Sequence, residues 1–348
     1  MTNIQDLTIH ENKSIIDALK KLNSITDISR LILFVFNSKQ EIIGSLTDGD
    51  IRRSLSTDQD LNKKVGDICF RKFTYKDEYD GFIELESIRK KDIKILPILN
   101  KDKTLSRIID LKKIKSILPL ECMIMAGGRG KRLSPLTDLV PKPMLLVGDK
   151  PIIEYNIDRL ISFGIKKIYI SVKYLGEQIE EYFGDGSSKG ISIEYIWENE
   201  ALGTAGALSL VKKFKSEHIL LMNSDLFTNV NIEEMFLNLI EQKADMVVAS
   251  IEYKIDVPYA VFESKGNDVL AFKEKPTYIY HSNAGIYIFK KELIHKIPKN
   301  KFYDITDLMD KLIEEGKKLI HDPIRGYWID IGKPTDYKNA QEFIKHLK

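Results

Sequence analysis

The strongest constraint on the fold is an alternation, from residue 120 onward, of short apolar runs with amphipathic stretches. The run ECMIMAGG precedes PIIEYNIDRLISFG, whose apolar or small residues recur at helical spacing, namely Ile153, Ile157, Leu160, Ile161 and Gly164. Three further strand-like runs, IKKIYISVKY, HILLMNSD and DMVVASIEY, and one helix-like stretch, GEQIEEYFG, continue the pattern. Strands that alternate with helices predict a mostly parallel α/β sheet covered on both faces, with ligands at the carboxyl ends of its strands.

The first 118 residues read as a separate small α/β module that contains an internal repeat. LILFVFNSKQEIIGSLTDGDIRRSL and IKILPILNKDKTLSRIIDLKKIKSIL each show a strand, a polar turn, a second strand and a short helix. Pro119 follows the last of these helices, and a proline there ends a helix and favours an extended entry into the next strand. We therefore predict domains at residues 1–118 and 119–348.

Composition excludes several classes of partner. The 53 basic and 51 acidic residues give a net charge of +2, which offers no global attraction to nucleic acid or to an anionic membrane. Two cysteines, Cys69 and Cys122, are too few for a disulfide framework and suit burial in a reducing compartment. No apolar run has the length of a signal-peptide core or a membrane span. We expect a cytoplasmic protein without nucleic-acid or membrane partners.

Residues 123–143, MIMAGGRGKRLSPLTDLVPKP, place bare backbone and positive charge directly after a strand. Glycines let backbone N–H groups approach a phosphate, here Gly127, Gly128 and Gly130. Charge-assisted donors follow from Arg129, Lys131 and Arg132. The stretch has neither the Lys-Ser/Thr pair of a Walker A loop nor the third glycine of a dinucleotide fingerprint, where Leu133 stands. By itself this stretch fits a phosphate cradle and a plain strand-to-loop turn equally well.

The full string GGRGKRLSPLTDLVPKPML, followed by KPIIEYNIDRL, resembles the signature GGxGxRLxPLTxxxPKPMLxVxxKPIIE of the sugar-phosphate nucleotidyltransferases. The resemblance continues in order through LGTAGAL (202–208), NSD (223–225), FKEKP (272–276), NAGIYIF (283–289) and WIDIGKPTDY (328–337). It covers residues 120–348, about two thirds of the chain. It implies a Rossmann-like domain in which a sugar 1-phosphate attacks the α-phosphorus of a nucleoside triphosphate, giving a nucleotide-sugar and pyrophosphate.

The resemblance assigns cationic residues to the phosphates. Joining two phosphates brings like charges together, so catalysis must rest on neutralisation and in-line positioning. Arg132 would grip the leaving pyrophosphate, and Lys142, held between Pro141 and Pro143, would bridge the α-phosphate and the attacking phosphate. The nucleotide-binding set implied by the motifs is Ala126, Gly127, Gly128, Gly130, Glu198, Glu200 and Gly203.

Two carboxylates from distant segments are candidates for a metal site. Asp225 ends the strand-like run ILLMNSD, and Asp330 lies in WID about a hundred residues later. Mg²⁺ prefers oxygen ligands and is often held by one or two carboxylates together with substrate phosphates. The family match selects this pair over a turn or helix cap. On the sugar side the resemblance implies Glu274 for the sugar hydroxyls, Lys275 for the sugar 1-phosphate, and Asn283 nearby.

The segment WENEALGTAGAL bears on the choice of base. Glu198 and Glu200 match a Glu-x-Glu pair that precedes LGTAG in family members that use GTP. A carboxylate can accept both the ring N–H and the amino N–H of guanine, which uracil and thymine do not offer together. Solvated loop charges are the equal alternative for both glutamates. We favour GTP on this basis.

The segment IIGSLTDGDIRRSL resembles the end of a cystathionine β-synthase-type (CBS) module, whose Gly-x-φ-Thr-x-x-Asp pattern, with φ an apolar residue, commonly binds adenine nucleotides. Thr47 and Asp50 would contact phosphate and ribose hydroxyls. In the second copy Asp110 and Lys113 stand at the corresponding positions, which breaks the pattern. Residues 1–118 therefore resemble a CBS pair that senses a nucleotide or that only packs against its twin to form a dimer.

A CBS pair ahead of such a transferase resembles the guanylyltransferases of bacterial surface-sugar pathways, in particular those that act on glucosamine 1-phosphate in legionaminic acid synthesis. This architecture implies glucosamine 1-phosphate as the acceptor for GTP. The carboxylate pair of the family match implies Mg²⁺, and for the chain as a whole we expect a homo-oligomer, a dimer. The alternatives within the same chemistry are a mannose- or heptose-1-phosphate guanylyltransferase and a uridylyl- or thymidylyltransferase. A non-catalytic nucleotide sensor is the alternative from another class, and the joint presence of the basic and acidic site residues argues against it.

Overall fold

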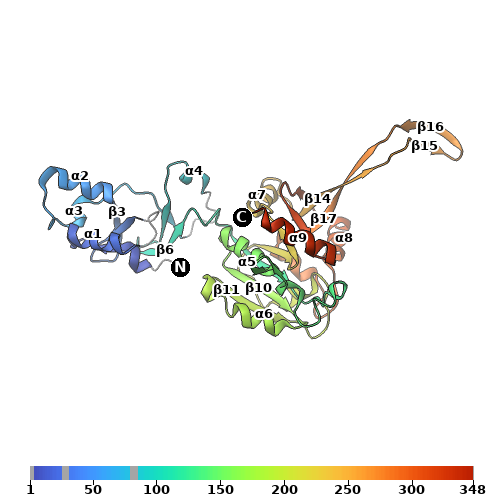
Figure 1. The fold of residues 1–348 in the computed structure, drawn as a ribbon, viewed down its shortest axis with the longest axis horizontal. Coiled ribbons are helices and arrows are strands. Elements are labelled where there is room, and N and C mark those ends of the chain that lie inside the picture. Colours follow the sequence, from blue (N-terminus) through green and yellow to red (C-terminus); the bar gives the residue numbers. More distant parts are fainter. Residues whose placement is uncertain (1–3, 26–30, 79–84, 348) are drawn as a thin grey trace. The chain divides into compact units, whose positions relative to one another are not determined.

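The computed structural model describes residues 4–25, 31–78 and 85–347 (Figure 1). The chain divides into two compact units, Met1–Leu118 and Pro119–Lys348. This division coincides with the boundary that Pro119 predicts. Within the described residues no helix is both long enough and apolar enough to span a membrane.

The first half of the N-terminal unit is a three-stranded sheet covered by helices. Strand β1 runs parallel to β2, and β2 runs antiparallel to β3. Apolar residues of α1 and α2 are buried against these strands, including Ile15, Ala18 and Ile51. The elements are η1 (Ile4–Leu7), β1 (Thr8–His10), α1 (Ile15–Ser24), β2 (Ile32–Phe36), β3 (Ile42–Thr47), α2 (Asp48–Asp58) and α3 (Val65–Ile68).

The second half repeats this strand topology, as the two similar segments of sequence predict. Strand β4 runs parallel to β5, and β5 runs antiparallel to β6. Its own small core includes Leu85, Leu96 and Ile109. The elements are β4 (Lys76–Asp77), α4 (Glu86–Arg89), β5 (Ile95–Leu99) and β6 (Leu105–Asp110).

The helix predicted after β6 is wrong, because residues 111–113 form a turn and residues 114–118 contain no helix. In the first copy, Thr47 and Asp50 form a capping box at the start of α2. In the second copy, the Arg89 guanidinium donates to the carbonyls of Leu111, Ile114 and Lys115. A helix needs these carbonyls for its own hydrogen bonds, so their capture keeps the chain in turns.

The C-terminal unit is built on a seven-stranded sheet in the order β11-β10-β7-β12-β17-β14-β18. Only β17 runs antiparallel to its neighbours, so the predicted mostly parallel sheet is confirmed. The strands are β7 (Leu120–Met125), β10 (Lys167–Val172), β11 (Ser192–Trp197), β12 (His218–Asn223), β14 (Met246–Asp256), β17 (Thr277–Lys290) and β18 (Leu319–Pro323). Successive residues of β7, β10 and β12 are buried, because both faces of the sheet are covered.

The helices of this unit follow the alternation that the sequence shows. They are α5 (Ile152–Ser162), α6 (Gly176–Phe183), α7 (Ile232–Glu241), α8 (Ile305–Glu314) and α9 (Pro334–Lys345). One apolar cluster joins α8 residues, such as Leu308 and Leu312, to Met123 and Leu221 of the central strands. Two short sheets lie beside the main one, formed by β8 (Leu146–Val147) with β9 (Lys150–Pro151) and by β13 (Leu226–Thr228) with β19 (Trp328–Asp330).

The strand order reverses beside β7, since the chain passes from β7 to β10 on one side and later reaches β12 on the other. In open α/β sheets, the carboxyl ends of strands at such a point form a ligand-binding crevice. The glycine-rich stretch follows β7, and Asp225 follows β12 by two residues. The topology therefore places both predicted motifs at one edge of the sheet.

An extended β-ribbon projects from this unit (Figure 1). Strands β14 and β17 continue past the sheet and lead into a second hairpin of β15 (Val261–Lys265) and β16 (Asp268–Lys273). We call residues 251–282 the arm. The sequence predicts a strand at DMVVASIEY but no ribbon beyond it, because the run loses its continuous apolar character after Ser250.

Candidate active site

A cavity of about 440 Å³ lies at the carboxyl ends of β7 and β12. Its walls come from the glycine-rich loop, from the ends of the two strands and from the 201–204 segment. The charged side chains that line it are Lys131, Arg132, Lys142, Glu198 and Asp225. It therefore combines exposed backbone, several cations and carboxylates in one hollow of the size of a small-molecule site.

The three glycines of the loop differ in their surroundings. A side chain at Gly127 would come within 2.9 Å of the Glu198 carboxylate. Gly130 adopts φ +66°, and a Cβ there would lie 3.0 Å from the Cβ of Lys142. A Cβ at Gly128 would meet no atom within 4 Å. The backbone at Gly128 is thus bare and open, as a phosphate-binding loop requires.

Lys142, Asp225 and Asp330 form the charged centre of the site. The Lys142 ammonium is hydrogen-bonded to Asp225 Oδ2 and lies 4.0 Å from Asp330 Oδ1. The two carboxylates meet because β13 pairs antiparallel with β19, which sets Leu226 opposite Asp330. The backbone N–H of Ile331 also donates to the carbonyl of Asp225. A short sheet therefore joins segments that are about a hundred residues apart.

The electrostatics of this centre favour a further cation. Burial raises the pKa of Asp330, and the neighbouring charge of Asp225 raises it further, while Lys142 and Arg132 lower it. Asp225 Oδ1 is buried without a hydrogen-bond partner. Across the described ranges no group of three or more His, Cys, Asp or Glu side chains is placed to hold a metal. Asp225 and Asp330 together offer two carboxylates, and one oxygen of Asp225 has no hydrogen-bond partner. This arrangement fits Mg²⁺ that takes its remaining ligands from phosphates and water.

Glu198 lines the cavity, but much of its carboxylate is engaged within the protein. Ser171 Oγ donates to Oε1, and the Leu202 backbone N–H donates to Oε2 at 3.0 Å. Glu198 is buried, whereas Glu200 is exposed and outside the cavity lining. The structure therefore separates two residues that the sequence treats as a pair.

The 203–204 segment is positioned by Asp304, a residue that no motif in the sequence indicates. Gly203 has φ +75°, and a Cβ there would lie 2.8 Å from Asp304 Oδ1. That oxygen accepts hydrogen bonds from the Thr204 N–H at 2.9 Å and from the Thr204 hydroxyl at 3.1 Å. Thr204 Oγ1 in turn accepts from the N–H of Ile305. Thr204 therefore shapes the loop, and both Gly203 and Thr204 line the cavity.

Other lining residues emerge only from the structure. Asn223 and Ser224 belong to the NSD motif, in which the sequence analysis selects only the aspartate. The motif itself could have identified them. Phe302 is 62% exposed and also lines the cavity, although no pattern in its neighbourhood indicates a site. Trp328 belongs to the WIDIGKPTDY motif but is not among the described residues that line the cavity. Its Nε1–H donates to the Ala284 carbonyl at 2.9 Å.

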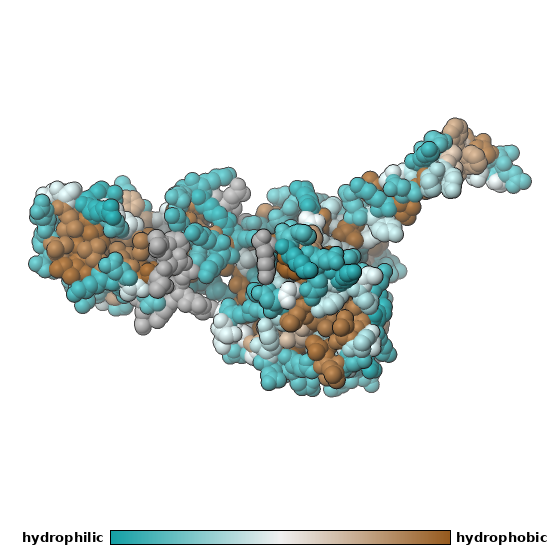
Figure 2. All heavy atoms as spheres, in the orientation of Figure 1, coloured by the Kyte–Doolittle hydropathy of each residue, from teal (hydrophilic) through white to brown (hydrophobic). Residues whose placement is uncertain are grey.

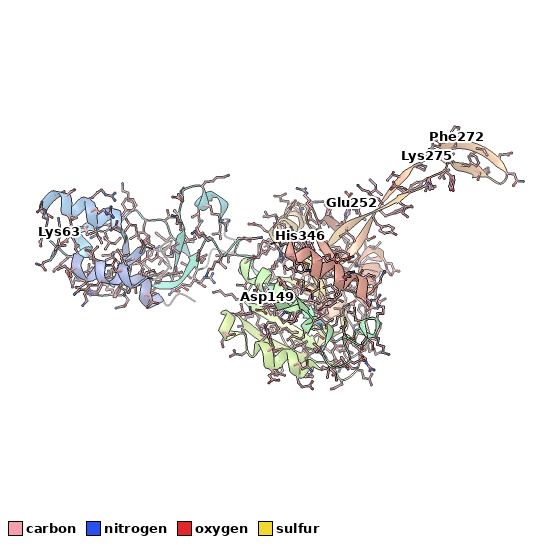
Figure 3. All side chains as sticks on the ribbon, in the orientation of Figure 1. Lys63, Asp149, Glu252, Phe272, Lys275 and His346 are labelled. Carbon is pink, nitrogen blue, oxygen red and sulfur yellow. The ribbon has the colours of Figure 1, made fainter. Side chains whose placement is uncertain are left out.

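Three residues assigned to the sugar side lie elsewhere. Glu274 and Lys275 are exposed on the arm, and Figure 3 shows Lys275 well out along the ribbon. Asn283 is an exposed residue of β17 whose Oδ1 accepts from the Gly285 N–H at 2.9 Å. Ala126 is buried, and its N–H donates to the Ser171 carbonyl. None of these four is among the described residues that line the cavity.

In the N-terminal unit Thr47 and Asp50 have structural partners. Thr47 Oγ1 donates to Asp50 Oδ2 at 2.6 Å, and the Thr47 N–H donates to the same oxygen at 2.8 Å. The other Asp50 oxygen is paired with Arg53. The two residues therefore form the N-terminal cap of α2, a role that needs no ligand.

A glycine-rich backbone, clustered cations and paired carboxylates at the switch point of an α/β sheet define a domain for phosphorylated ligands. Residues 121–346 match the sequence profile described as Nucleotidyl transferase, and the chain belongs to that family. Residues 1–57 match the CBS domain profile. The N-terminal CBS domain and the α/β transferase fold are thus confirmed, while the CBS match covers only the first of the two predicted copies.

The chain is similar to several known proteins. It is 36% identical over 233 residues to a D-glycero-alpha-D-manno-heptose 1-phosphate guanylyltransferase of Aneurinibacillus thermoaerophilus, covering 65% of this chain and 99% of that protein. It is 31% identical over 242 residues to a UTP--glucose-1-phosphate uridylyltransferase of Synechocystis sp., covering 64% and 62%. The crystal structure of HddC from Yersinia pseudotuberculosis complexed with GMP-PN has a TM-score of 0.51 at 24% identity, covering 64% and 99%, and shares the fold.

Proposed function

We propose that this protein transfers a nucleoside monophosphate from a nucleoside triphosphate to a sugar 1-phosphate and releases pyrophosphate. The observation that carries the proposal is the position of Lys142 between Asp225 and Asp330, beside the bare backbone at Gly128. The relatives named above are sugar-1-phosphate guanylyl- and uridylyltransferases, which supports the same reaction class here.

In this proposal the residues of the chain position the phosphates and do no covalent chemistry. Arg132 and the loop N–H groups hold the β- and γ-phosphates that leave as pyrophosphate. Lys142 neutralises the α-phosphate and the attacking phosphate oxygen, and its low exposure strengthens that interaction. The attacking oxygen forms a bond to the α-phosphorus as the bond to the leaving oxygen breaks, so no proton need be removed from a phosphate dianion.

Asp225 and Asp330 are the residues that would hold Mg²⁺ in this scheme. When bound, the cation neutralises phosphate charge and orients the triphosphate. The buried, unpartnered Asp225 Oδ1 and the raised pKa of Asp330 support this assignment. Binding of Mn²⁺ as a spin probe, followed without any substrate, tests the site independently of activity, and Asp330→Asn should weaken it.

We propose GTP as the nucleotide and glucosamine 1-phosphate as the acceptor, in bacterial surface-sugar synthesis of the legionaminic acid type. The guanylyltransferase relative and the place of Glu198 at the cavity support GTP. Glu200 lies outside the cavity, so Glu198 alone would bind guanine. Its carboxylate already accepts one hydrogen bond from Ser171 and one from Leu202, and guanine would use the lone pairs that remain. The CBS domain ahead of the transferase supports the surface-sugar assignment. Mannose and heptose 1-phosphates are the alternative acceptors.

The decisive experiment measures pyrophosphate release with Mg²⁺ across four nucleoside triphosphates and the 1-phosphates of glucosamine, N-acetylglucosamine, mannose and glucose. We expect one strong signal, for GTP with glucosamine 1-phosphate, and its loss in Asp225→Ala. Asp310→Ala, at an exposed position of α8 outside the cavity lining, is the matched control. Activity only with UTP or dTTP contradicts the role of Glu198. A well-folded wild type that is silent with every combination contradicts the transferase and favours the nucleotide sensor.

A second proposal concerns the N-terminal unit, where the CBS match supports binding of an adenine nucleotide near Thr47 and Asp50. Calorimetry with AMP and ATP tests it. Thr47→Ala removes the α2 cap and should lower stability by about 1 kcal/mol whether or not a ligand binds. Heat of binding in the wild type that is lost in this variant supports the site, whereas no heat in the wild type contradicts it.

A further inference from the structure

The arm exposes a large apolar surface. Nine large apolar side chains of the arm are 42–75% exposed, and the most exposed of them are Tyr259, Leu270 and Phe272. Figure 2 shows apolar residues gathered at the end of the ribbon, where β15 and β16 lie. Soluble monomers rarely expose apolar surface of this extent, and such surfaces are typical of binding sites.

The sequence of the arm is patterned as if one face is covered. Tyr253 pairs with Tyr280, and Ile255 pairs with Tyr278, so these four side chains share one face of the ribbon. The other face carries Glu252, Lys254, Asp256 and Thr277, with Ile279 as its apolar exception. Alternation of this kind is typical of a sheet with one buried face. In this chain both faces of the ribbon are in water.

The arm is not placed to cover the cavity of its own chain. Its ladder is a direct continuation of the central sheet, paired from Ile251 with Ser282 through Asp256 with Thr277. The described residues that line the cavity include none from the arm, and exposed Phe302 lies at that cavity. The residues of the FKEKP motif are therefore held away from the site of their own chain.

The size and charge of the arm suit a second copy of this chain. With about 200 Å² for a fully exposed large side chain, the exposed fractions of all nine side chains, on both faces of the ribbon, correspond to roughly 1,000 Å², which is of the order of the roughly 800 Å² per partner of a standard interface. Residues 251–282 carry five acidic and four basic side chains, so two identical arms meet without net repulsion. A symmetric dimer buries the same patch on both copies.

We propose that the arm binds a second copy of this chain and carries Glu274 and Lys275 to that copy's cavity. The inference rests on the proposed function, in which these two residues contact the sugar phosphate. In the cavity itself Lys142 is shared between the α-phosphate, the attacking phosphate and its partner Asp225, so a second cation at the attacking phosphate adds to the neutralisation of charge. Lys275 has φ +43°, a backbone strain for a lysine that is often found at functional sites. Each active site is then complete only in the dimer.

The first test measures oligomeric state by sedimentation equilibrium on the full chain. We expect a wild-type dimer, and Tyr253→Ser/Tyr280→Ser should raise its dissociation constant at least about 100-fold. The matched control is the adjacent cross-strand pair on the other face, Lys254→Ser/Ile279→Ser, because Ile279 and Tyr280 are both 54% exposed. The control should remain dimeric. A monomeric wild type, or equal weakening in both variants with their melting temperatures unchanged, overturns the proposal.

The second test asks which copy supplies Lys275. Asp225→Ala and Lys275→Ala chains carrying different tags are co-expressed, and the mixed dimer is purified through both tags. Exchange of arms gives one complete site per mixed dimer, so about half of wild-type pyrophosphate release should return although each parent is inactive. An inactive mixed dimer overturns the transfer of Lys275 between copies. If the wild type itself releases no pyrophosphate, the proposed function fails, while sedimentation still decides whether the arm forms the dimer.

Discussion

The β14–β17 ladder has two halves that differ in burial and in residue pattern, although the same two strands form both. In the half within the sheet, successive residues are buried on both faces, as at Val247, Val248, Ile286 and Ile288. In the arm, apolar and polar side chains alternate, and nearly all are exposed. The comparison teaches that backbone pairing continues where burial stops. A two-stranded ribbon is marginal by itself, so the arm depends on what covers it.

The largest expected difference between the two regions is catalytic. Lys142→Gln, in the body, should lower kcat/KM for pyrophosphate release roughly 1,000-fold, because a charge on the transferring phosphates is lost. Lys254→Gln, on the polar face of the arm, should change it less than about twofold, since an exposed lysine contributes little. Steady-state kinetics measure both. Comparable losses would show that the polar face of the arm also contacts substrate.

The next difference is in stability. Phe289→Ala removes a side chain that is 0% exposed in β17 and should cost about 3–5 kcal/mol of unfolding free energy. Phe272→Ala removes one that is 64% exposed in β16 and should stay within about 0.5 kcal/mol in the monomer. Urea unfolding of the C-terminal unit measures both at concentrations below dimer formation. A large loss of unfolding free energy in Phe272→Ala would contradict the difference between the two regions, because the arm would then be buried in its own chain.

A smaller effect concerns the buried end of the ladder, where Asp245 precedes β14. Burial opposes ionisation of Asp245, but hydrogen bonds from Lys290 and the Lys318 backbone, with the charge of Lys290, outweigh it and lower its pKa. The stabilisation is therefore present above the ordinary pKa of 3.8 and is lost as pH falls through the lowered value.

Asp245→Asn should accordingly cost about 2 kcal/mol at pH 7, where a charged hydrogen-bond acceptor is lost. The difference from wild type should shrink as pH falls below 3.8, because both proteins then carry a neutral side chain. Denaturant midpoints at a series of pH values test this. A difference that is constant with pH would mean that the charge of Asp245 is not what stabilises the strand.

The smallest effect is expected at the far end of the same ladder. Glu263 and Lys273 form an ion pair at 3.0 Å, with their side chains 56% and 58% exposed. Water and salt screen such a pair. Glu263→Gln should therefore leave the unfolding midpoint unchanged within error. A clear shift would show that the pair is covered by protein, which would place the dimer interface on this face of β15.

Much of the fold follows directly from local pattern. Mostly apolar runs at residues 120–125, 167–172 and 218–223 predict buried parallel strands, and the amphipathic stretches between them predict α5 and α6. The helix after β6 is mispredicted because Arg89, more than twenty residues earlier, captures its carbonyls. A local pattern carries no information on such a distant donor.

Some residues of the site can also be predicted from local motifs, whereas others cannot. Gly127, Gly128, Gly130, Arg132, Lys142 and Asp225 lie close together in the sequence signature or at a strand end, and all of them line the cavity. Asp304 and Phe302 are invisible to motif reasoning, because their roles arise only when a segment a hundred residues away folds against the 203–204 loop. The placement of Lys275 also escapes it, since a motif names a residue without showing which chain's cavity it reaches.

The alternation of strands and helices, the division of the chain at Pro119 and the position of the glycine-rich loop after β7 all follow from local sequence, because each depends on neighbouring residues. Three features depend on the tertiary structure. Asp225 and Asp330 are brought together by the pairing of β13 with β19, and Glu198 lines the cavity whereas Glu200 does not. The arm projects beyond the sheet (Figure 1). Pairing of strands far apart in sequence decides these positions, and it depends on the packing of the whole unit.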